Sequence, residues 1–268
     1  MKRFTKLIIS IIYISMLTFK NALIMFFRSI PPSSFLVVTY HSVHTDQIDK
    51  FIQHILFSRE VGVHVHPDID GPLIQGRRHI AMTFDDGFEN YYYNALPLLI
   101  EYKIPSTVFV PTGFIGSKQG WIKEKNNRNY EENIMSQNQI ADLPPDFVKI
   151  GSHGVSHLPF DKMNNEGILI ELSESKQVLD QILGRETRLL ALPHGAYIDG
   201  IEDMSDKTGY DRVFLNVPIS SSTKFGNRSA GRIDITLDDW PIEYKLKYLG
   251  AYQWQRYYFR IKDILKTI

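Results

Sequence analysis

Short apolar runs alternate with amphipathic stretches along the central part of the chain. Runs such as FLVVTY and HIAMTF are rich in β-branched and aromatic residues, which is typical of buried strands. The stretches between them carry one apolar face at helical spacing, which favours helices. The predicted strands are 35–40, 79–84, 107–110, 147–150, 189–192, 212–217 and 231–235, and the predicted helices are 46–60, 89–102, 162–183 and 200–208.

This alternation predicts an α/β fold. Strands that alternate with helices form parallel sheets through right-handed crossovers, and this number of units suggests a distorted, incomplete (β/α)7 TIM-like barrel. We expect a hydrophobic helix over residues 1–30, the barrel over 35–240 and a basic amphipathic helix over 241–268. In such barrels the catalytic groups lie where strands end and loops begin.

The N-terminal segment is apolar and has a basic start. An apolar run over 7–19 is interrupted by Lys20 and resumes at 22–27. It is interpreted as an uncleaved membrane helix that spans the bilayer or lies in its interface, as a cleaved secretory signal, or as a core helix. We expect membrane association through this helix, at the cell envelope or the cytoplasmic face of the inner membrane. Cleavage would instead give a secreted or periplasmic protein, although no convincing small-x-small cleavage site is present.

The C-terminal segment 244–268 alternates aromatic residues with lysine and arginine. This composition suits a lipid headgroup layer. A terminal helix that packs on the barrel and exposes a basic face explains the same pattern equally well.

Composition narrows the chemistry. The chain has 268 residues, of which 43% are apolar and 22% charged, so it can bury a core. It has 30 basic and 30 acidic residues, and this balance gives no indication of a nucleic-acid partner. Because cysteine is absent, disulfides, thiolate metal sites and a cysteine nucleophile are excluded, and any metal must be bound by His, Asp or Glu.

Three polar clusters follow predicted strands. TFDDG (83–87) places Asp85 and Asp86 at a strand end, where alternation predicts that they point to opposite sides and have different roles. GSHGVSH (151–157) holds two histidines four residues apart, and imidazole suits zinc, iron, cobalt or nickel. LALPHG (190–195) forms a rigid turn whose backbone N–H groups can face an oxyanion. Each motif alone is weak, since DDG turns and surface histidine pairs are common.

Taken in order, TFDDG, HGVSH and LPHG resemble the motifs of the polysaccharide deacetylase family, the NodB-homology domain of carbohydrate esterase family 4. The resemblance covers residues 36–235. It implies that Asp85 is the catalytic base and that the metal ligands are Asp86, His153 and His157. The segments VTYHSV and GRIDI are similar to deacetylases of surface-polysaccharide biosynthesis, such as those acting on poly-N-acetylglucosamine.

The chain departs from the family pattern at three places. Gly154 stands where Ser or Thr is usual between the two histidines, and Ala191 stands where many members carry an arginine that orients the base. Arg232 is our candidate for that orienting role. No histidine follows His194, so the late Leu-x-His motif that supplies the catalytic acid is missing. The acid is then His41, His194 or protonated Asp85, and His41 is preferred because it ends the first predicted strand.

The resemblance implies a metal-dependent hydrolase that removes acetyl groups from the N-acetylated sugars of a polysaccharide or glycan. The metal is a divalent ion, with zinc preferred and cobalt, nickel or iron as alternatives. Three other functions stay open. The enzyme can act on another amide or on an O-acetyl ester, or the chain can be a non-catalytic glycan-binding or scaffold protein that keeps the fold. The chain can also be a membrane-tethered subunit that docks a glycan-synthesis complex.

Overall fold

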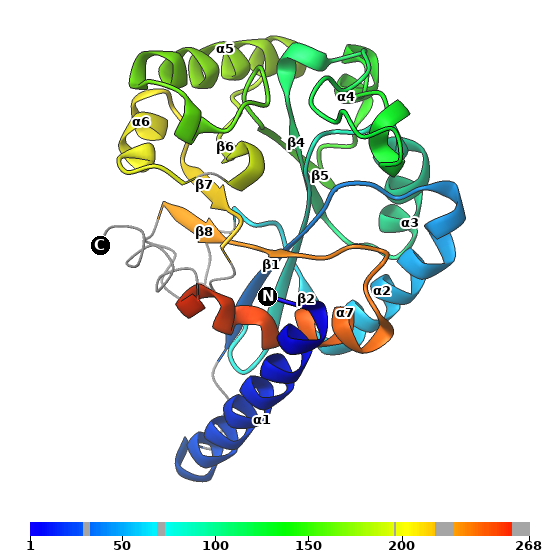
Figure 1. Ribbon diagram of the computed structural model, residues 1–268, viewed down its shortest axis with the longest axis vertical. Helices are drawn as coiled ribbons and strands as arrows, with labels where there is room; N and C mark the ends of the chain where they lie inside the picture. Colours follow the sequence, from blue (N-terminus) through cyan, green and yellow to red (C-terminus); the bar gives the residue numbers. More distant parts are fainter. Residues whose placement is uncertain (29–32, 69–72, 196, 218–227, 259–268) are drawn as a thin grey trace.

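Parallel strands form the centre of the protein and curl into a nearly closed barrel (Figure 1). This arrangement confirms the predicted TIM-like α/β architecture. The computed structural model describes residues 1–28, 33–68, 73–195, 197–217 and 228–258. The strands are β1 (Ser34–Tyr40), β2 (Val63–His64), β3 (Arg78–Phe84), β4 (Ser106–Val110), β5 (Val148–Ser152), β6 (Leu189–Ala191), β7 (Arg212–Leu215), β8 (Ser229–Gly231) and β9 (Ile233–Asp234).

The barrel closes at Arg232. The strands follow the order β8-β7-β6-β5-β4-β3-β1-β9, and β2 pairs with β3 beside this path. The two end strands β8 and β9 are separated in the sequence by Arg232 alone. The single strand predicted at 231–235 is therefore wrong in detail. The chain leaves its pairing with β7 at Gly231 and joins β1 from Ile233 onward, so the residue between belongs to neither ladder.

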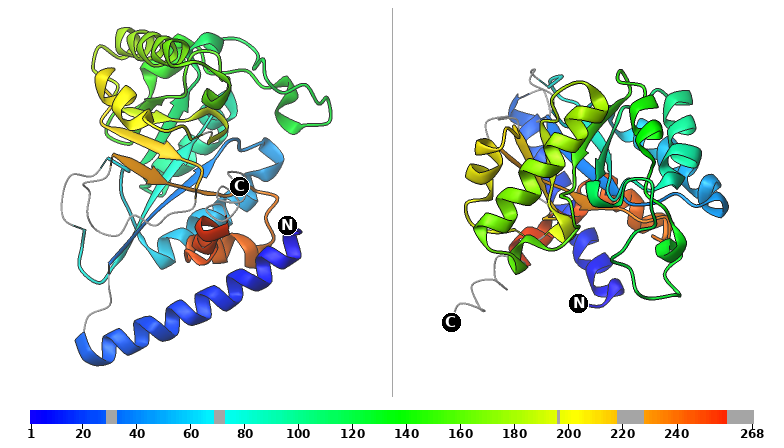
Figure 2. Two further views of the ribbon diagram at one scale, coloured as in Figure 1. Left: turned by 60° about the vertical axis from the view of Figure 1, so that its left-hand side comes forward. Right: turned by 90° about the horizontal axis from the view of Figure 1, so that it is seen from above.

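Helices cover the outside of the barrel (Figures 1 and 2). The region predicted as one helix over 89–102 begins with a π-helical turn, η2, before α3. Helix α5 is capped by the Asn164 side chain, which accepts a hydrogen bond from the Gly167 N–H, and it ends at Gly184 in the left-handed conformation. The helices are α1 (Arg3–Arg28), α2 (Ile48–Val61), η2 (Tyr91–Ala95), α3 (Leu96–Glu101), α4 (Gln137–Asp142), α5 (Asn165–Leu183), α6 (Ile201–Lys207) and α7 (Pro241–Tyr248), and the short 3₁₀ turns are η1 (Thr45–Gln47), η3 (Thr112–Phe114), η4 (Arg128–Glu131), η5 (Phe160–Lys162), η6 (Pro193–Gly195) and η7 (Ala251–Trp254).

Side-chain alternation along the strands separates an inner core from an outer one. In β1, Phe35 and Val37 point into the barrel, where they belong to the same cluster as Ala81 of β3. The intervening residues, such as Leu36 and Val38, pack against the surrounding helices. Because side chains repeat every two residues, the inward positions of β1 and β3 continue to polar groups at the carboxyl ends of these strands.

Both ends of the described chain pack on the same side of the barrel. Helix α1 runs along this side beside α7 and η7 (Figure 2). Among the described helices, α1 is long and apolar enough to cross a membrane by length and composition. The C-terminal segment, expected as one basic helix over 241–268, begins as α7, breaks at Gly250 with a φ of 77° and continues as η7. Its last part, 259–268, lies outside the described residues.

Candidate metal and catalytic site

Asp86, His153 and His157 converge at the carboxyl ends of β3 and β5. Their ligand atoms all lie within 4.8 Å of one another, and all three side chains are buried. The Nε2 atom of His157 is 3.1 Å from Asp86 Oδ1, and Nε2 of His153 is 3.7 Å from the same oxygen. One carboxylate and two imidazoles at this separation form a donor set that suits a divalent transition metal.

Left-handed backbone turns bring these side chains together. Asp85 continues the inward alternation of β3, and its N–H donates to Tyr40 O at 2.8 Å. Asp86 leaves the strand, with a φ of 70°, and Gly87 follows with a φ of 62°. The expectation that strand alternation alone separates the two aspartates is therefore incomplete. The turn carries the Asp86 carboxylate around to the histidines, so both aspartates face one cavity from different directions.

His153 is fixed in orientation and protonation state. Its Nδ1 lies 2.8 Å from the carbonyl oxygen of Ala191, so the Nδ1–H donates and Nε2 is free to bind a cation. Burial lowers the pKa of His153 to about 4, against the opposing effect of the Asp85 carboxylate. The ring is therefore neutral near pH 7, which is the form that binds metal.

Trp121 supports the second histidine. Its indole stacks on the His157 imidazole, with ring centroids 3.9 Å apart and an angle of 27° between the planes. In the sequence, Trp121 lies in a polar, poorly periodic segment, 117–139, where stacking on a sugar ring and anchoring of the loop are both compatible with an aromatic residue. The contact with His157 was missed because no sequence pattern connects the two residues.

A buried glutamate holds the loop between the histidines. The Glu171 carboxylate on α5 accepts hydrogen bonds from the backbone N–H groups of Val155, at 2.6 Å, and Ser156, at 2.9 Å. Gly154 has a φ of 75°, and a Cβ there would lie 2.9 Å from Glu171 Oε2. The glycine that replaces the usual Ser or Thr therefore fits both the backbone and this carboxylate. Sequence reasoning missed Glu171 because it appeared only as a polar position on a predicted helix.

Arg232 forms a two-point ion pair with Asp85 inside the barrel. Its Nη1 and Nη2 donate to the two carboxylate oxygens at 2.6 and 2.8 Å, and both side chains are almost fully buried. Burial would raise the pKa of Asp85, but the Arg232 charge and the neighbouring histidines outweigh it and lower the pKa to about 2. Asp85 is therefore ionised at every ordinary working pH. The contact expected from the sequence is present.

The LPHG turn supports this pair through Asn216. The side-chain oxygen of Asn216 accepts a hydrogen bond from Arg232 Nη2 at 2.7 Å. A Cβ at Gly195 would lie 2.4 Å from Asn216 Cβ, so the glycine leaves the space that Asn216 occupies. The Gly195 N–H donates to Leu192 O at 2.9 Å, and proline has no N–H. Of the oxyanion donors expected in this turn, the N–H of His194 is the remaining candidate. Asn216 was not identified from the sequence.

The two candidate acids lie on the cavity wall. His41 follows β1, and its Nδ1 is 3.7 Å from Asp234 Oδ1. Burial lowers the pKa of His41, but the carboxylates of Asp86, Asp234 and Asp85 raise it more, so the net direction is upward. His194 is exposed, and its ring lies 4.7 Å from that of His157. Burial and the neighbouring His157 lower the pKa of His194.

All seven site residues expected from the sequence come together around one cavity or directly beneath it. The cavity has a volume of about 590 Å³ and is lined by both aspartates and by the four histidines predicted as site residues. The polar segment 117–139 is longer than most loops, which is typical of a lid, a binding loop or a disordered loop, and it contributes Trp121, Ile122 and residues 126–129 to the cavity wall. Arg232 lies behind Asp85.

Known structures share this fold. IcaB from Ammonifex degensii is similar with a TM-score of 0.66 at 22% identity, covering 82% of this chain and 97% of that one. The Streptococcus pyogenes deacetylase PplD, solved in complex with acetate, is similar with a TM-score of 0.63 at 21% identity, covering 77% of this chain and 94% of that one. At this level of identity the likeness establishes the fold.

Sequence relatives and a family model extend the comparison. YxkH of Bacillus subtilis is 21% identical over 216 residues, which cover 76% of this chain and 72% of that protein. The poly-β-1,6-N-acetyl-D-glucosamine N-deacetylase of Staphylococcus aureus is 26% identical over 144 residues, 50% of this chain and 46% of the enzyme, so the match spans about half of that relative's length. The model of the family described as polysaccharide deacetylase matches residues 74–213, more than half of the chain. The chain therefore belongs to the polysaccharide deacetylase family, whose reaction is hydrolysis of the carbon–nitrogen bond of polysaccharide N-acetyl groups.

Proposed function

We propose that this protein is a metal-dependent deacetylase that hydrolyses the acetamide of N-acetylated sugars in a polysaccharide, releasing acetate and leaving a free amine. The observation that carries the proposal is the juxtaposition of two units in one cavity. A buried Asp–His–His group lies beside a buried aspartate that an arginine holds in the ionised state.

The residues fit a divalent metal. Asp86, His153 and His157 would hold it, and the Ala191 carbonyl already orients His153 so that Nε2 is available. Three protein ligands are typical of catalytic zinc sites, and zinc is our preferred ion, with cobalt, nickel and iron as alternatives. When bound, such an ion supplies Lewis acidity, which polarises the acetyl carbonyl and makes water a nucleophile near neutral pH.

Asp85 is proposed as the general base. Its oxygens both pair with Arg232, yet each carboxylate oxygen has a second lone pair that can accept a proton from water. Arg232 fixes the direction of these lone pairs because its own guanidinium is held by Asn216 and by weaker contacts with Thr39 and Thr83. Arg232 thus acts on the base as a positioning residue.

His41 is proposed as the general acid that protonates the departing amine. It borders the same cavity as Asp85, and its raised pKa favours the protonated form that an acid needs. His194 remains the second candidate, but its pKa is shifted downward, which favours the neutral ring.

The proposed substrate is a poly-N-acetylglucosamine-like glycan. The family supports an N-acetylated polysaccharide, and the S. aureus relative is named for poly-β-1,6-N-acetyl-D-glucosamine. We place the reaction at a membrane through α1, at the cell envelope or the cytoplasmic face of the inner membrane. Cleavage of α1 as a secretory signal would instead release the barrel from the membrane.

The test combines metal analysis with acetate release. Purified protein is assayed with N-acetylglucosamine oligomers and with an O-acetylated glycan, and its bound metal is measured. We expect one divalent ion per chain and acetate from the N-acetylated substrate. Asp86→Ala should lose both metal and activity, whereas Asp85→Asn should keep the metal and lose about 10²–10⁴-fold in rate. The exposed Asp49→Asn is the matched control.

Two outcomes would overturn the proposal. Acetate release from the O-acetylated glycan alone would make the protein an esterase. Glycan binding with no acetate release from metal-loaded protein would leave a binding or scaffold role.

A further inference from the structure

Helix α1 is apolar on the face that it turns outward as well as on the face that packs on the barrel. Residues at helical spacing, from Leu7 and Ser10 to Leu17 and Asn21, are buried or half-buried against the barrel side. Ile9, Ile14 and Ile24 are half-buried as well, so the inward face is mainly apolar. A helix of a soluble protein usually turns a polar face outward. The outward face is apolar over most of its length, with exposed fractions of 63% for Phe4, 44% for Ile8, 55% for Ile12, 68% for Met16, 74% for Phe19 and 54% for Leu23.

The first half of α1 is firmly attached to the barrel. Arg3 Nε donates to Glu243 Oε2 at 2.7 Å, and the Arg3 guanidinium lies 4.4 Å from the centre of the Trp240 ring. Farther along, Trp254 Nε1 donates to Ser10 Oγ at 2.8 Å, and both side chains are buried. A helix of 26 residues is about 39 Å long, and its N-terminal half cannot enter a bilayer end-on while these contacts persist. The attached helix instead suits a position in the plane of the interface.

Basic and aromatic residues border the apolar face on one flank. Lys6, Tyr13 and Lys20 are spaced by seven residues, so they share a side of the helix. Arg256 lies close enough to Tyr13 to influence its pKa, which burial raises and this arginine opposes. Lysine stems at this border can extend to the headgroups while the apolar face enters the acyl region.

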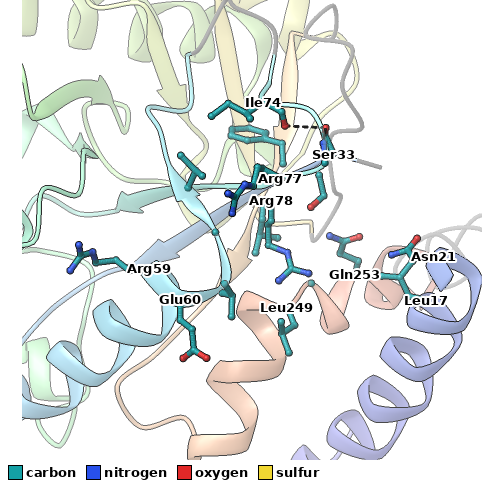
Figure 3. Close-up of a pocket in the computed structure, with 18 residues that line it drawn as sticks. Leu17, Asn21, Ser33, Arg59, Glu60, Ile74, Arg77, Arg78, Leu249 and Gln253 are labelled. Carbon is teal, nitrogen blue, oxygen red and sulfur yellow. Dashed lines mark hydrogen bonds between the residues drawn. The ribbon is translucent and has the colours of Figure 1, made fainter. Parts of the chain in front are cut away.

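A large cavity opens behind α1, at the end of the barrel opposite the catalytic site. It has a volume of about 730 Å³ and lies between the second half of α1, the starts of β1 and β3, and the link from α7 to η7 (Figure 3). Figure 3 shows Arg77 and Arg78 on its wall, with Asn21 and Gln253 across from them. This cavity is larger than the catalytic one, and the deacetylation mechanism does not use it.

The described residues that line the cavity carry a net positive charge. Arg78 is half-buried, and among the residues that the structure describes, no hydrogen bond or ion pair involves its guanidinium. Arg77 beside it is exposed and likewise forms no ion pair with a described residue. Among the described residues that line this cavity, Glu60 is the one acidic residue. A half-buried cation without a counter-ion is unfavourable, so the site is suited to an anion from outside the chain.

We infer that Arg77 and Arg78 bind the phosphate of an anionic phospholipid, on a membrane-docking face whose apolar part is the outward side of α1. An interfacial helix lies about 5–10 Å into the boundary between headgroups and acyl chains. The barrel side of α1 is then one helix-packing distance, about 8–10 Å, farther from the bilayer centre, which is the depth of the phosphates. Guanidinium groups bind phosphate through paired N–H donors.

This inference deepens the membrane association proposed above and does not depend on the deacetylation chemistry. It also fixes the orientation of the barrel. Arg3, at the start of α1, donates to the backbone oxygen of Asp238, a residue on the rim of the catalytic cavity. The helix therefore runs from that rim to the arginine cavity, and the catalytic opening lies beside the membrane surface.

The phosphate site is tested with full-length protein and vesicles. Flotation is compared between phosphatidylcholine vesicles and vesicles that also contain phosphatidylglycerol. For the double variant Arg77→Gln/Arg78→Gln we expect about thirty-fold weaker binding to the anionic vesicles and little change on the neutral ones. Arg185→Gln, an exposed arginine at the end of α5, is the matched control and should bind as the native protein does.

Three results would contradict the phosphate site. Equal losses of vesicle binding for the double variant and the control would mean that general surface charge, and not this site, binds the vesicles. Unchanged vesicle binding of the double variant would mean that Arg77 and Arg78 do not bind lipid. Tight binding of inorganic phosphate without vesicles, abolished in the double variant, would assign the cavity to a soluble phosphate compound.

The position of α1 is tested by depth measurement. Because the chain contains no cysteine, single cysteines at Phe4, Ile12 and Leu23 can be labelled with a fluorophore that brominated lipids quench. An in-plane helix gives similar depth at all three, whereas Ile170→Cys on α5 should stay unquenched. A spanning helix would place residues 4 and 23, about 28 Å apart along the axis, at opposite interfaces with Ile12 deeper than both.

The outcomes separate this inference from the broader proposals. A spanning depth profile would overturn the in-plane geometry and leave membrane association standing. Absence of vesicle binding by the native protein would remove both, while acetate release would still decide the enzymatic proposal independently.

Discussion

Arg232 and Asp85 form a two-point ion pair at the position where the barrel closes. Arg232 is the single residue between β8 and β9, the two end strands of the sheet, and Asp85 follows β3. One residue therefore links the two end strands and holds the proposed base. The arginine lies at a different position in the chain from the one that carries it in many family members, yet its guanidinium reaches the aspartate at 2.6 and 2.8 Å.

Removing this arginine should move the acid limb of the pH–rate profile upward. The base must be ionised, and its activity is lost as pH falls through the pKa of Asp85. The Arg232 charge lowers that pKa to about 2, whereas burial alone would raise it, so Arg232→Met should raise the pKa and shift the acid limb of kcat/KM to higher pH. The measurement is kcat/KM against pH for both proteins.

The control for this prediction keeps the charge. Arg232→Lys should shift the acid limb less than Arg232→Met, because an ammonium still faces the carboxylate without its two-point geometry. Since breaking a buried ion pair costs about 3–5 kcal/mol, folding and metal content are measured for each variant. An unchanged acid limb in folded, metal-loaded Arg232→Met would refute the role of the arginine in setting the pKa of Asp85.

Metal binding should stabilise the fold. Addition of zinc to metal-free protein at about 100 times its Kd should raise the free energy of unfolding by about 2.7 kcal/mol, which is visible as a higher Tm. Asp86→Ala should show no such rise, and Asp85→Asn should retain it. A zinc-induced rise of native size in Asp86→Ala would place the metal elsewhere.

Much of the site was predictable because its ligands lie in short, ordered motifs. Asp86 lies just after β3, and His153 and His157 lie in the loop after β5, so the parallel strands bring all three to the same end of the barrel. The supporting residues were not predictable in this way. Asn216 contacts Arg232 from a position that is open only because residue 195 is a glycine. Glu171, in the middle of a helix, binds the backbone of the loop between the two histidines. Such contacts depend on how separate elements pack.

The fold was predicted where periodicity is strong and missed where pairing partners change. The apolar runs that form β1 and β3 are buried on both faces, and their composition clearly predicts strands. The end of the barrel was read as one continuous strand because the residues before and after Arg232 are both compatible with β structure. Only the exchange of partners between β7 and β1 divides them, and composition does not encode it.

The catalytic acid can be identified by comparing variants of His41 and His194. His41→Asn should lower kcat and remove the alkaline limb of the pH–rate profile, since a general acid is lost as pH rises through its pKa, and the pKa of His41 is shifted upward. His194→Asn should keep that limb and change mainly KM, because the ring is exposed and its pKa is lowered. The reverse pattern would make His194 the acid.

Glu171 should control metal affinity without contacting the metal. Its carboxylate holds the N–H groups of Val155 and Ser156, and these residues set the spacing between the two histidine ligands. Glu171→Ala should therefore weaken metal binding by about 10–100-fold, as expected when a group that supports the ligands is lost. The measurement is a competition titration with a chromophoric chelator, and activity should return at saturating metal.

The matched control for this last test is Glu174→Ala, an exposed glutamate on the same helix. Both changes remove one carboxylate from α5, so a general effect on the helix or on net charge would appear equally in the two. A loss of metal affinity confined to Glu171→Ala, with activity recovered by added metal, isolates the loop as the cause. Permanent loss of activity despite full metal loading would instead mean that the loop positions the substrate.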